Sequence, residues 1–301
     1  MNILVTGGAG FIGTHLVSNL LKNNFKVRIF ENFSNSKKES ISNLIDLGAE
    51  IIEGDITNLT EVLDASKDQE VIIHLAAIIS VEESIKNPKR TFEVNVQGTK
   101  NILEACKRNN IKKLVVASSS AVYGESSENQ KLTENSNLNP ISPYGESKLR
   151  MEQEINNFVI KNKINVIILR FFNIFGIGQS SEYAGVITKF VDRIRENKSL
   201  EIFGDGKQTR DFVSVNDVVN SIKISITTKN TGIFNIASEK AITIKELANK
   251  MIELSGKTLN IIFLPAKKGD IKFSQADISL ARTMLGYSPK FELNEIKNLF
   301  D

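Results

Sequence analysis

A tyrosine and a lysine four residues apart are the side chains of this chain best suited to acid–base chemistry. They lie in Ser142-Pro-Tyr-Gly-Glu-Ser-Lys148, where Ser142 suits a helix N-cap and Pro143 suits the first helical position. Tyr144 and Lys148 then share one helix face, one turn apart. A phenol has an ordinary pKa of about 10, too high for an efficient base near neutral pH. Because a neighbouring ammonium lowers that pKa, the pair predicts proton transfer, although Tyr-x-x-x-Lys also occurs often by chance.

A glycine-rich stretch near the start of the chain is the second chemical feature. The apolar run Ile3-Leu-Val5 reads as a buried strand, and Gly8-Ala-Gly-Phe-Ile-Gly13 matches the G-x-G-x-x-G fingerprint before an amphipathic helix. Glycines permit the sharp turn and let a pyrophosphate approach backbone N–H groups at the helix start. This order predicts a dinucleotide site rather than a plain strand–turn–helix. The expected contacts in this loop are Gly7, Gly10, Phe11, Ile12 and Gly13.

Carboxylates end the second and third expected strands. The second strand, residues 26–30, is followed by Glu31, which can accept both adenosine ribose hydroxyls and repels a 2′-phosphate. This favours NAD over NADP, with Lys37 and Lys38 read as a solvated helix start. The third strand ends at Asp55, which can reach the adenine amine or simply form a turn.

Composition narrows the class of protein. The chain has 301 residues and a net charge of +3, and its basic residues are scattered, which argues against nucleic-acid binding. Cys106 is the only cysteine, so no disulfide within the chain and no cysteine-based metal site is expected. His15 and His74 are read as structural, and no metal is predicted. The sequence shows neither a signal peptide nor an apolar run of about 18 residues, so it predicts a cytoplasmic protein without membrane contact.

The alternation of strands and helices predicts an α/β fold: a Rossmann-type doubly wound parallel sheet with a smaller α/β substrate-binding domain. Ligands are expected beyond the carboxyl ends of the strands, where three serines, 118–120, follow the fifth strand. After about residue 172 the rhythm breaks into short, turn-rich segments. We therefore expect an NAD-binding domain over 1–172 and a mainly substrate-binding domain over 173–301, partly interleaved with the first and able to return a strand to its sheet.

Taken together, the motifs resemble those of the extended short-chain dehydrogenase/reductases, in particular their NAD-dependent sugar-nucleotide epimerases and dehydratases. The resemblance spans essentially the whole chain. It is carried by Thr6-Gly-Gly-Ala-Gly-Phe-Ile-Gly13, Glu31-Asn-Phe-Ser34, Gly54-Asp-Ile56, His74-Leu-Ala-Ala77, Asn95-Val-Gln-Gly-Thr99, Ser118-Ser-Ser-Ala-Val-Tyr-Gly124, Tyr144-x-x-x-Lys148, Arg170-Phe-Phe-Asn173, Arg210-Asp-Phe-Val213 and Lys268-Gly-Asp270.

The resemblance implies 4-epimerisation of a UDP-hexose through a transient 4-keto intermediate. Tyr144 takes the proton of the sugar 4-hydroxyl, Lys148 holds the nicotinamide ribose and lowers the pKa of Tyr144, and Ser119 bonds O4. Further cofactor contacts are implied at Asn32, Asp55, Ile56, Leu75, Ala76, Ala77, Tyr144, Lys148 and Phe172. Substrate contacts are implied at Ser119, Ser120, Asn173, Arg210, Lys267, Asp270 and Ser274.

Departures from the family pattern refine these expectations. Dehydratases and decarboxylases carry an acidic residue in the motif that here has Ser120 and Ala121, which favours epimerisation. Lys267 replaces a diphosphate-binding arginine, keeping the charge but losing the fork, and Glu31 replaces the commoner Asp.

Ser274 stands where members restricted to plain hexoses carry a tyrosine. UDP-N-acetylglucosamine and UDP-N-acetylgalactosamine are therefore expected beside UDP-glucose and UDP-galactose, unless Phe273 fills that space. Another nucleotide-sugar epimerase or reductase, or a non-catalytic NAD-binding regulator, remains an alternative. The resemblance also implies a homodimer formed through helices near 89–109 and 143–162.

Overall fold

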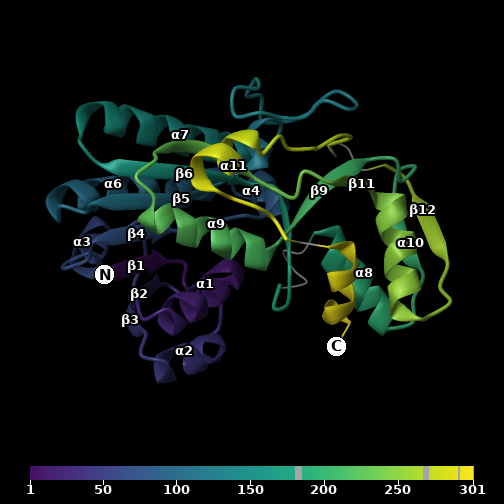
Figure 1. Ribbon diagram of the computed structural model, residues 1–301, viewed down its shortest axis with the longest axis horizontal. Coiled ribbons are helices and arrows are strands. Elements are labelled where there is room, and N and C mark those ends of the chain that lie inside the picture. The colour runs from purple at the N-terminus through teal and green to yellow at the C-terminus, as the bar shows by residue number, and fades with distance from the viewer. Residues whose placement is uncertain (180–184, 267–270, 291, 301) are drawn as a thin grey trace.

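The chain forms two bodies, seen in a computed structural model. The larger body has helices on both sides of a central sheet, and the smaller body carries the C-terminal end of the chain (Figure 1). The structure describes residues 1–179, 185–266, 271–290 and 292–300.

A seven-stranded sheet forms the centre of the larger body, and all its neighbouring strands run parallel. The strand order is β10-β6-β5-β4-β1-β2-β3. The strands are β1 (Asn2–Thr6), β2 (Lys26–Glu31), β3 (Glu50–Glu53), β4 (Val71–His74), β5 (Lys113–Ser119), β6 (Asn165–Phe171) and β10 (Gly232–Ile236). The order reverses between β1 and β4, which places a binding crevice at their carboxyl ends. The predicted doubly wound parallel sheet is confirmed.

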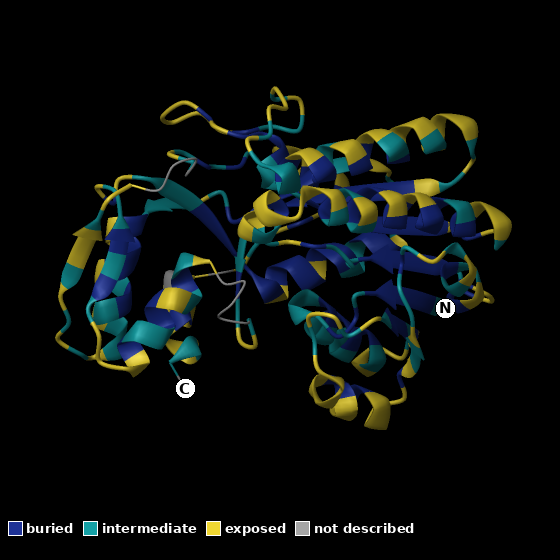
Figure 2. Cartoon of the chain, turned by 180° about the vertical axis from the view of Figure 1, so that it is seen from behind, coloured by how far each residue is buried: buried dark blue, intermediate teal, exposed yellow. Residues whose placement is uncertain are grey.

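Helices cover both faces of this sheet. One face carries α1 (Phe11–Lys22), α2 (Ser42–Asp46), α9 (Val215–Thr227) and α11 (Ser279–Leu285). The other carries α3 (Leu59–Ala65), α6 (Gly98–Arg108) and α7 (Pro143–Lys161). Ile3 and Val5 pack into the first core cluster and Leu4 into the second, as alternation along a strand requires. Burial is concentrated in the sheet and on the helix sides that face it (Figure 2).

The helix expected near 89–109 is built in pieces. After α4 (Val81–Lys86), α5 (Pro88–Phe92) runs into a π-helical turn, η2 (Glu93–Gln97), and then into α6. Asn95 lies buried in that turn. Its amide accepts a hydrogen bond from Ile78 N and donates to Ile78 O and Ser147 Oγ, at 2.8, 2.9 and 2.9 Å. The turn thus joins the segment after β4 to α7.

The smaller body has a core cluster of its own. Its two sheets have the strand orders β11-β9-β7 and β12-β8. The strands are β7 (Asn173–Phe175), β8 (Leu200–Phe203), β9 (Thr209–Ser214), β11 (Ala241–Thr243) and β12 (Ile261–Leu264). They pack with α8 (Val186–Arg195), α10 (Ile244–Ser255) and the 3-10 segment η5 (Leu293–Leu299).

The second half of the chain contributes to both bodies. β10 pairs with β6 in the large sheet, and α9 and α11 cover one face of that sheet. The domain boundary at residue 172 stays a prediction, and the chain crosses between the bodies more than once. Within the described residues, no helix is both long and apolar enough to cross a bilayer.

Candidate active site

The glycine loop after β1 closes on itself too tightly for side chains. Gly7 has φ +70°, and a Cβ there would lie 2.7 Å from Ala76 N, at the end of β4. A Cβ on Gly13 would lie 2.3 Å from Gly7 O. Helix α1 begins beyond Gly10, whose extended backbone leaves the first helical N–H groups without a side-chain cap. The loop therefore offers close-packed backbone and a helix start, the surroundings that a pyrophosphate requires.

Glu31 lies at the end of the crevice where the adenosine is expected. Its two carboxylate oxygens accept hydrogen bonds from Ala9 N and Phe33 N, each at 3.2 Å. Burial raises the pKa of Glu31, and these backbone bonds oppose the rise. Lys38 is engaged elsewhere: its Nζ lies 2.6 Å from Glu53 Oε2 and 5.3 Å from the centre of the Phe33 ring. The Glu31 carboxylate, by contrast, faces the glycine loop, where its charge would repel a cofactor 2′-phosphate.

Two residues at this end of the crevice, Arg90 and Ser36, were not predicted from the sequence. Asp55 accepts hydrogen bonds from Thr57 and from Asn32 Nδ2. It also forms an ion pair with Arg90 of α5 at 3.3 Å, which places a positive charge at this end of the crevice. Partial burial raises the pKa of Asp55, but these hydrogen bonds and the Arg90 charge outweigh it and lower the pKa. Ser36 Oγ is buried without a hydrogen-bond partner among the described residues. It follows Glu31 by five residues and suits a bound ligand.

Strand β5 and helix α7 bring the three predicted catalytic residues together. Ser142 Oγ accepts from Gly145 N at 3.1 Å and caps α7 as expected. Ser119, at the end of β5, hydrogen-bonds Tyr144. Lys148 is 4% exposed and its Nζ donates to Ala117 O of the same strand at 2.8 Å. This group can therefore accept and donate a proton next to the crevice.

Burial dominates the electrostatics of this group. Burial raises the pKa of Tyr144, and the bond with Ser119 opposes the rise. Burial lowers the pKa of Lys148 to about 8, against the charge of Glu152. The Lys148 ammonium contacts the β5 backbone, so its predicted lowering of the Tyr144 pKa stays a prediction.

His74 serves the core beneath this group. Its ring lies between Thr6 Oγ1 at 2.8 Å and Thr99 Oγ1 at 3.0 Å. Burial and the nearby Lys148 charge lower the pKa of His74 to about 3, so the ring is neutral. It joins β1, β4 and α6, which agrees with the structural reading of this histidine.

A cavity of about 190 Å³ opens at Ser119, which is the member of the catalytic group that lines it. It is lined by Ser119, Ser120, Ala121, Phe171, Phe172, Asn173, Arg210, Ile271 and Ser274. Five of these lining residues belong to the predicted substrate set. Lys267 and Asp270 lie outside the described residues. Arg210 comes from β9, so both bodies contribute to the cavity wall.

Comparisons with known proteins agree with this geometry. Residues 3–237 match the sequence model of the NAD-dependent epimerase/dehydratase family. The chain belongs to that family. A protein of Methanocaldococcus jannaschii named as a putative UDP-glucose 4-epimerase is 40% identical over 97% of this chain and 95% of its own length.

Two solved structures of the same kind are similar throughout. A UDP-N-acetylglucosamine 4-epimerase from Methanobrevibacter ruminantium M1, in complex with UDP-N-acetylmuramic acid, is 35% identical with a TM-score of 0.93, over 99% of this chain and 95% of that one. A UDP-glucuronic acid 4-epimerase from Bacillus cereus, in complex with UDP-glucuronic acid and NAD, is 34% identical with a TM-score of 0.91, over 99% and 97%.

The cofactor of this epimerase/dehydratase family member is NAD, and the described residues fit it. The glycine loop leaves no room for a Cβ at Gly7 or Gly13. Glu31 faces the same loop through Ala9 N, and Lys38 is occupied by Glu53. The loop would then hold the pyrophosphate, Glu31 the adenosine ribose and Lys148 the nicotinamide ribose.

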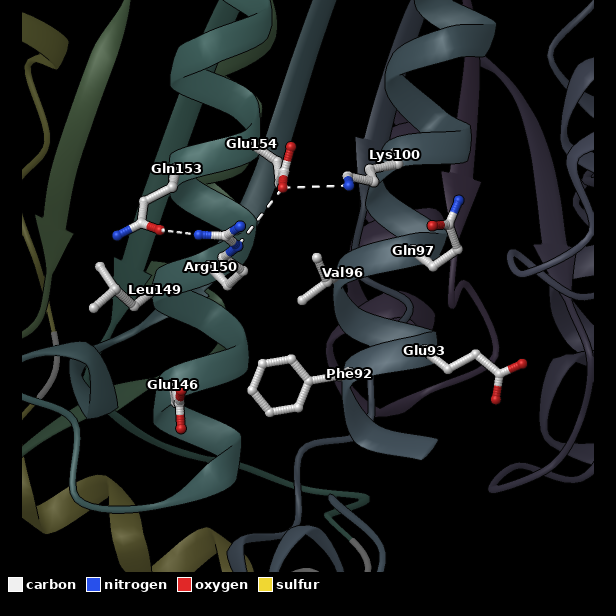
Figure 3. Close-up of a pocket in the computed structure, with 10 residues that line it drawn as sticks. All are labelled: Phe92, Glu93, Val96, Gln97, Lys100, Glu146, Leu149, Arg150, Gln153 and Glu154. Carbon is white, nitrogen blue, oxygen red and sulfur yellow. Dashed lines mark hydrogen bonds and ion pairs between the residues drawn. The ribbon is translucent and has the colours of Figure 1, made fainter. Parts of the chain in front are cut away.

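A larger cavity of about 530 Å³ lies on the outer face of the protein, away from this chemistry. Figure 3 shows it between α7 and the run from α5 to α6, with Phe92 and Val96 pointing toward α7. Charged side chains surround it, and Glu154 pairs with Lys100 at 3.3 Å and with Arg150 at 3.7 Å. It contains none of the predicted site residues.

Proposed function

We propose that this chain catalyses the NAD-dependent 4-epimerisation of UDP-hexoses, both the UDP-glucose/UDP-galactose pair and their N-acetylated counterparts. The observation that carries this proposal is the grouping of Ser119, Tyr144 and Lys148 beside a cavity that Arg210 also lines. The family supports it, and so do the three relatives described above, whose names are those of UDP-sugar 4-epimerases.

The residues of the site suit a reaction that exchanges a proton at the 4-hydroxyl. Bound NAD supplies the redox chemistry at C4. Tyr144 accepts the hydroxyl proton and later returns it, while Ser119 holds the sugar oxygen by a hydrogen bond. Arg210 supplies a positive charge for the diphosphate. The strand β5 motif carries Ser120 and Ala121 where dehydratases carry an acidic residue, which favours epimerisation over dehydration.

A panel of UDP-sugars tests the proposal. The purified chain is incubated with UDP-glucose, UDP-galactose, their N-acetylated forms and UDP-glucuronic acid, and the epimers are separated by chromatography. Interconversion without net consumption of NADH supports an epimerase. Stoichiometric consumption of NADH identifies a reductase, and binding of NAD without turnover of any sugar identifies a regulator. Turnover of UDP-glucuronic acid alone would overturn the hexose assignment.

Ser274 is proposed to set the acceptance of N-acetylated sugars. It is a small residue in the cavity lining, whereas its neighbour Phe273 is not among the lining residues. Asp211 fixes this segment by accepting a bond from Ala276 N at 3.2 Å, and Ser126 Oγ donates to Phe273 O at 2.8 Å. A bulky side chain at position 274 would therefore enter the sugar space rather than swing away.

We expect Ser274→Tyr to lower kcat/KM for UDP-N-acetylglucosamine by roughly tenfold or more while sparing UDP-glucose, because the added ring excludes the acetamido group. Steady-state rates with both sugars measure this. Lys272→Tyr, at an exposed position outside the lining, is the matched control and should change neither rate. Equal use of both sugars by Ser274→Tyr, or no use of the acetylated sugar by the native chain, contradicts the assignment.

A homodimer is proposed through the outer cavity between α7 and α5–α6. Its rim carries both positive residues, such as Arg150, and negative ones, such as Glu146, so a two-fold related copy can place opposite charges together.

We expect Phe92→Asp to convert the protein to a monomer, read as molar mass by light scattering. Ile45→Asp, which changes an exposed apolar residue on α2, should leave the mass unchanged. A native chain that is monomeric contradicts the proposal.

A further inference from the structure

Three side chains of α7, spaced one turn apart, bind the last three residues of β5. Tyr144 hydrogen-bonds Ser119, and Lys148 Nζ donates to Ala117 O at 2.8 Å. The third is Glu152, which accepts a hydrogen bond from Ser118 Oγ. The first two contacts belong to the catalytic group, whereas the third repeats their pattern one turn further from the cavity.

Glu152 is held in turn by a buried arginine of β6. Arg170 and Glu152 are each 2% exposed, and two parallel bonds join them: Nε to Oε1 at 3.0 Å and Nη2 to Oε2 at 2.7 Å. Arg170 Nη1 also donates to Tyr123 OH at 2.9 Å and to Glu134 O at 3.1 Å. The carboxylate therefore has one fixed orientation, with donors from β5 and β6.

A buried ion pair of this kind needs a reason beyond stability. Removing two charges from water costs several kcal/mol per ion, and well-packed apolar residues often replace such a pair without loss. Glu152 follows Lys148 by four residues on the same helix face, and Arg170 of β6 pairs with Ser118, the neighbour of the Ala117 that Lys148 binds. The charge of Glu152 favours the ammonium form of Lys148 and opposes the effect of burial on its pKa.

We propose that Glu152, fixed by Arg170, is a positioning residue for Lys148: it holds the strand end that Lys148 binds and supplies the negative charge that Lys148 faces. This inference rests on the proposed function, because it assigns Lys148 a part in the reaction. Arg170 acts one step further away, by orienting the Glu152 carboxylate.

The other groups around Lys148 do not supply that charge. On its own helix, burial raises the pKa of Tyr144 and so favours the uncharged phenol until the residue acts as a base, and on β4 His74 is neutral. The elements packed on α7 present neutral groups here: Ser84 Oγ of α4 accepts from Tyr144 N at 3.1 Å, and Asn95 of η2 bonds Ser147. Glu152 is therefore the anion to alter.

The test follows Lys148 directly by its 13Cε chemical shift in NAD-loaded protein, with the resonance assigned by its loss in Lys148→Met. The native lysine should titrate near pH 8. We expect Glu152→Gln to lower that midpoint by about one pH unit. If the chain turns over a UDP-sugar, the pKa on the alkaline side of the kcat–pH profile should fall by the same number of pH units, because Lys148 loses its proton at lower pH. KM should stay unchanged.

The double variant Glu152→Gln/Arg170→Gln separates positioning from stability. It removes both charges, so no lone guanidinium is left buried, and its melting temperature should exceed that of Glu152→Gln. Its Lys148 midpoint should nevertheless remain below the native one. A native midpoint in the double variant would overturn the proposal, whether or not Glu152→Gln itself folds. Because the titration needs no substrate, it remains readable if no sugar in the panel is turned over.

Discussion

We expect Tyr144→Phe to lower kcat by about 10²–10⁴-fold and to leave NAD bound, since it removes the proton carrier and keeps the ring. The backbone of Tyr144 helps to hold the start of α7: its N donates to Ser84 Oγ of α4, and its carbonyl accepts from Ser147 Oγ at 2.7 Å. The helix should therefore keep its place. Turnover is measured with whichever UDP-sugar the native chain uses, and bound nucleotide is measured after denaturation.

The matched control is Tyr287→Phe, which deletes a phenol oxygen at a distant buried site. Tyr287 OH donates to Ala237 O at 3.0 Å, so its loss should cost about 1 kcal/mol of stability and leave kcat unchanged. A Tyr144→Phe variant with near-native kcat would show that another group carries the proton. A variant that loses NAD as well would place the phenol oxygen among the cofactor contacts.

The parts of the site that could be predicted from sequence are those with local signals. Gly10 and Gly13 sit at fixed spacing after a strand, and Ser142 with Pro143 marks the start of α7. Each depends on backbone geometry within a few residues, and the structure reproduces the loop and the cap. The strands were recognisable because both faces of a parallel sheet are buried, which makes them uninterrupted apolar runs.

The parts that could not be predicted depend on pairing over long distances in the chain. Glu152 reads as one more polar residue of an amphipathic helix until β6 brings Arg170 against it. Arg90 and Asp55 are 35 positions apart in the sequence, and no local pattern near either residue predicts their contact. A strand returning to the large sheet was expected, but which segment returns depends on pairing of the same kind, because the five residues of β10 suit either body and only the finished edge of β6 selects one.

The break in the helix over 89–109 shows how a local rule yields to packing. The apolar spacing continues through the segment, so helical periodicity alone gives no sign of the π-helical turn η2. The buried amide of Asn95 finds all its partners only in that turn, through Ile78 and Ser147. An unsatisfied buried amide costs about 1–3 kcal/mol, so these three bonds favour the π-helical turn.

We expect Gly13→Ala to abolish NAD retention and to lower the stability of the chain by roughly 1–3 kcal/mol, because the added methyl group has no space. It would lie 2.3 Å from Gly7 O and 2.7 Å from Gly8 Cα, and backbone atoms cannot rotate away as side chains do. Helix α1 must then move off the loop, which separates the helix start from the turn that holds the pyrophosphate. Released nucleotide and the melting temperature measure the two effects.

Gly185→Ala is the control for adding a methyl group to a glycine. An added Cβ there meets nothing within 4 Å, and the backbone φ of −66° suits any residue. This variant should keep its NAD and its melting temperature. If Gly13→Ala also keeps its NAD and its melting temperature, the loop can accept a methyl group and the steric argument is wrong. If it loses stability but retains NAD, then Gly13 serves the packing of α1 on β1 alone, and the pyrophosphate depends on the amides nearer Gly10.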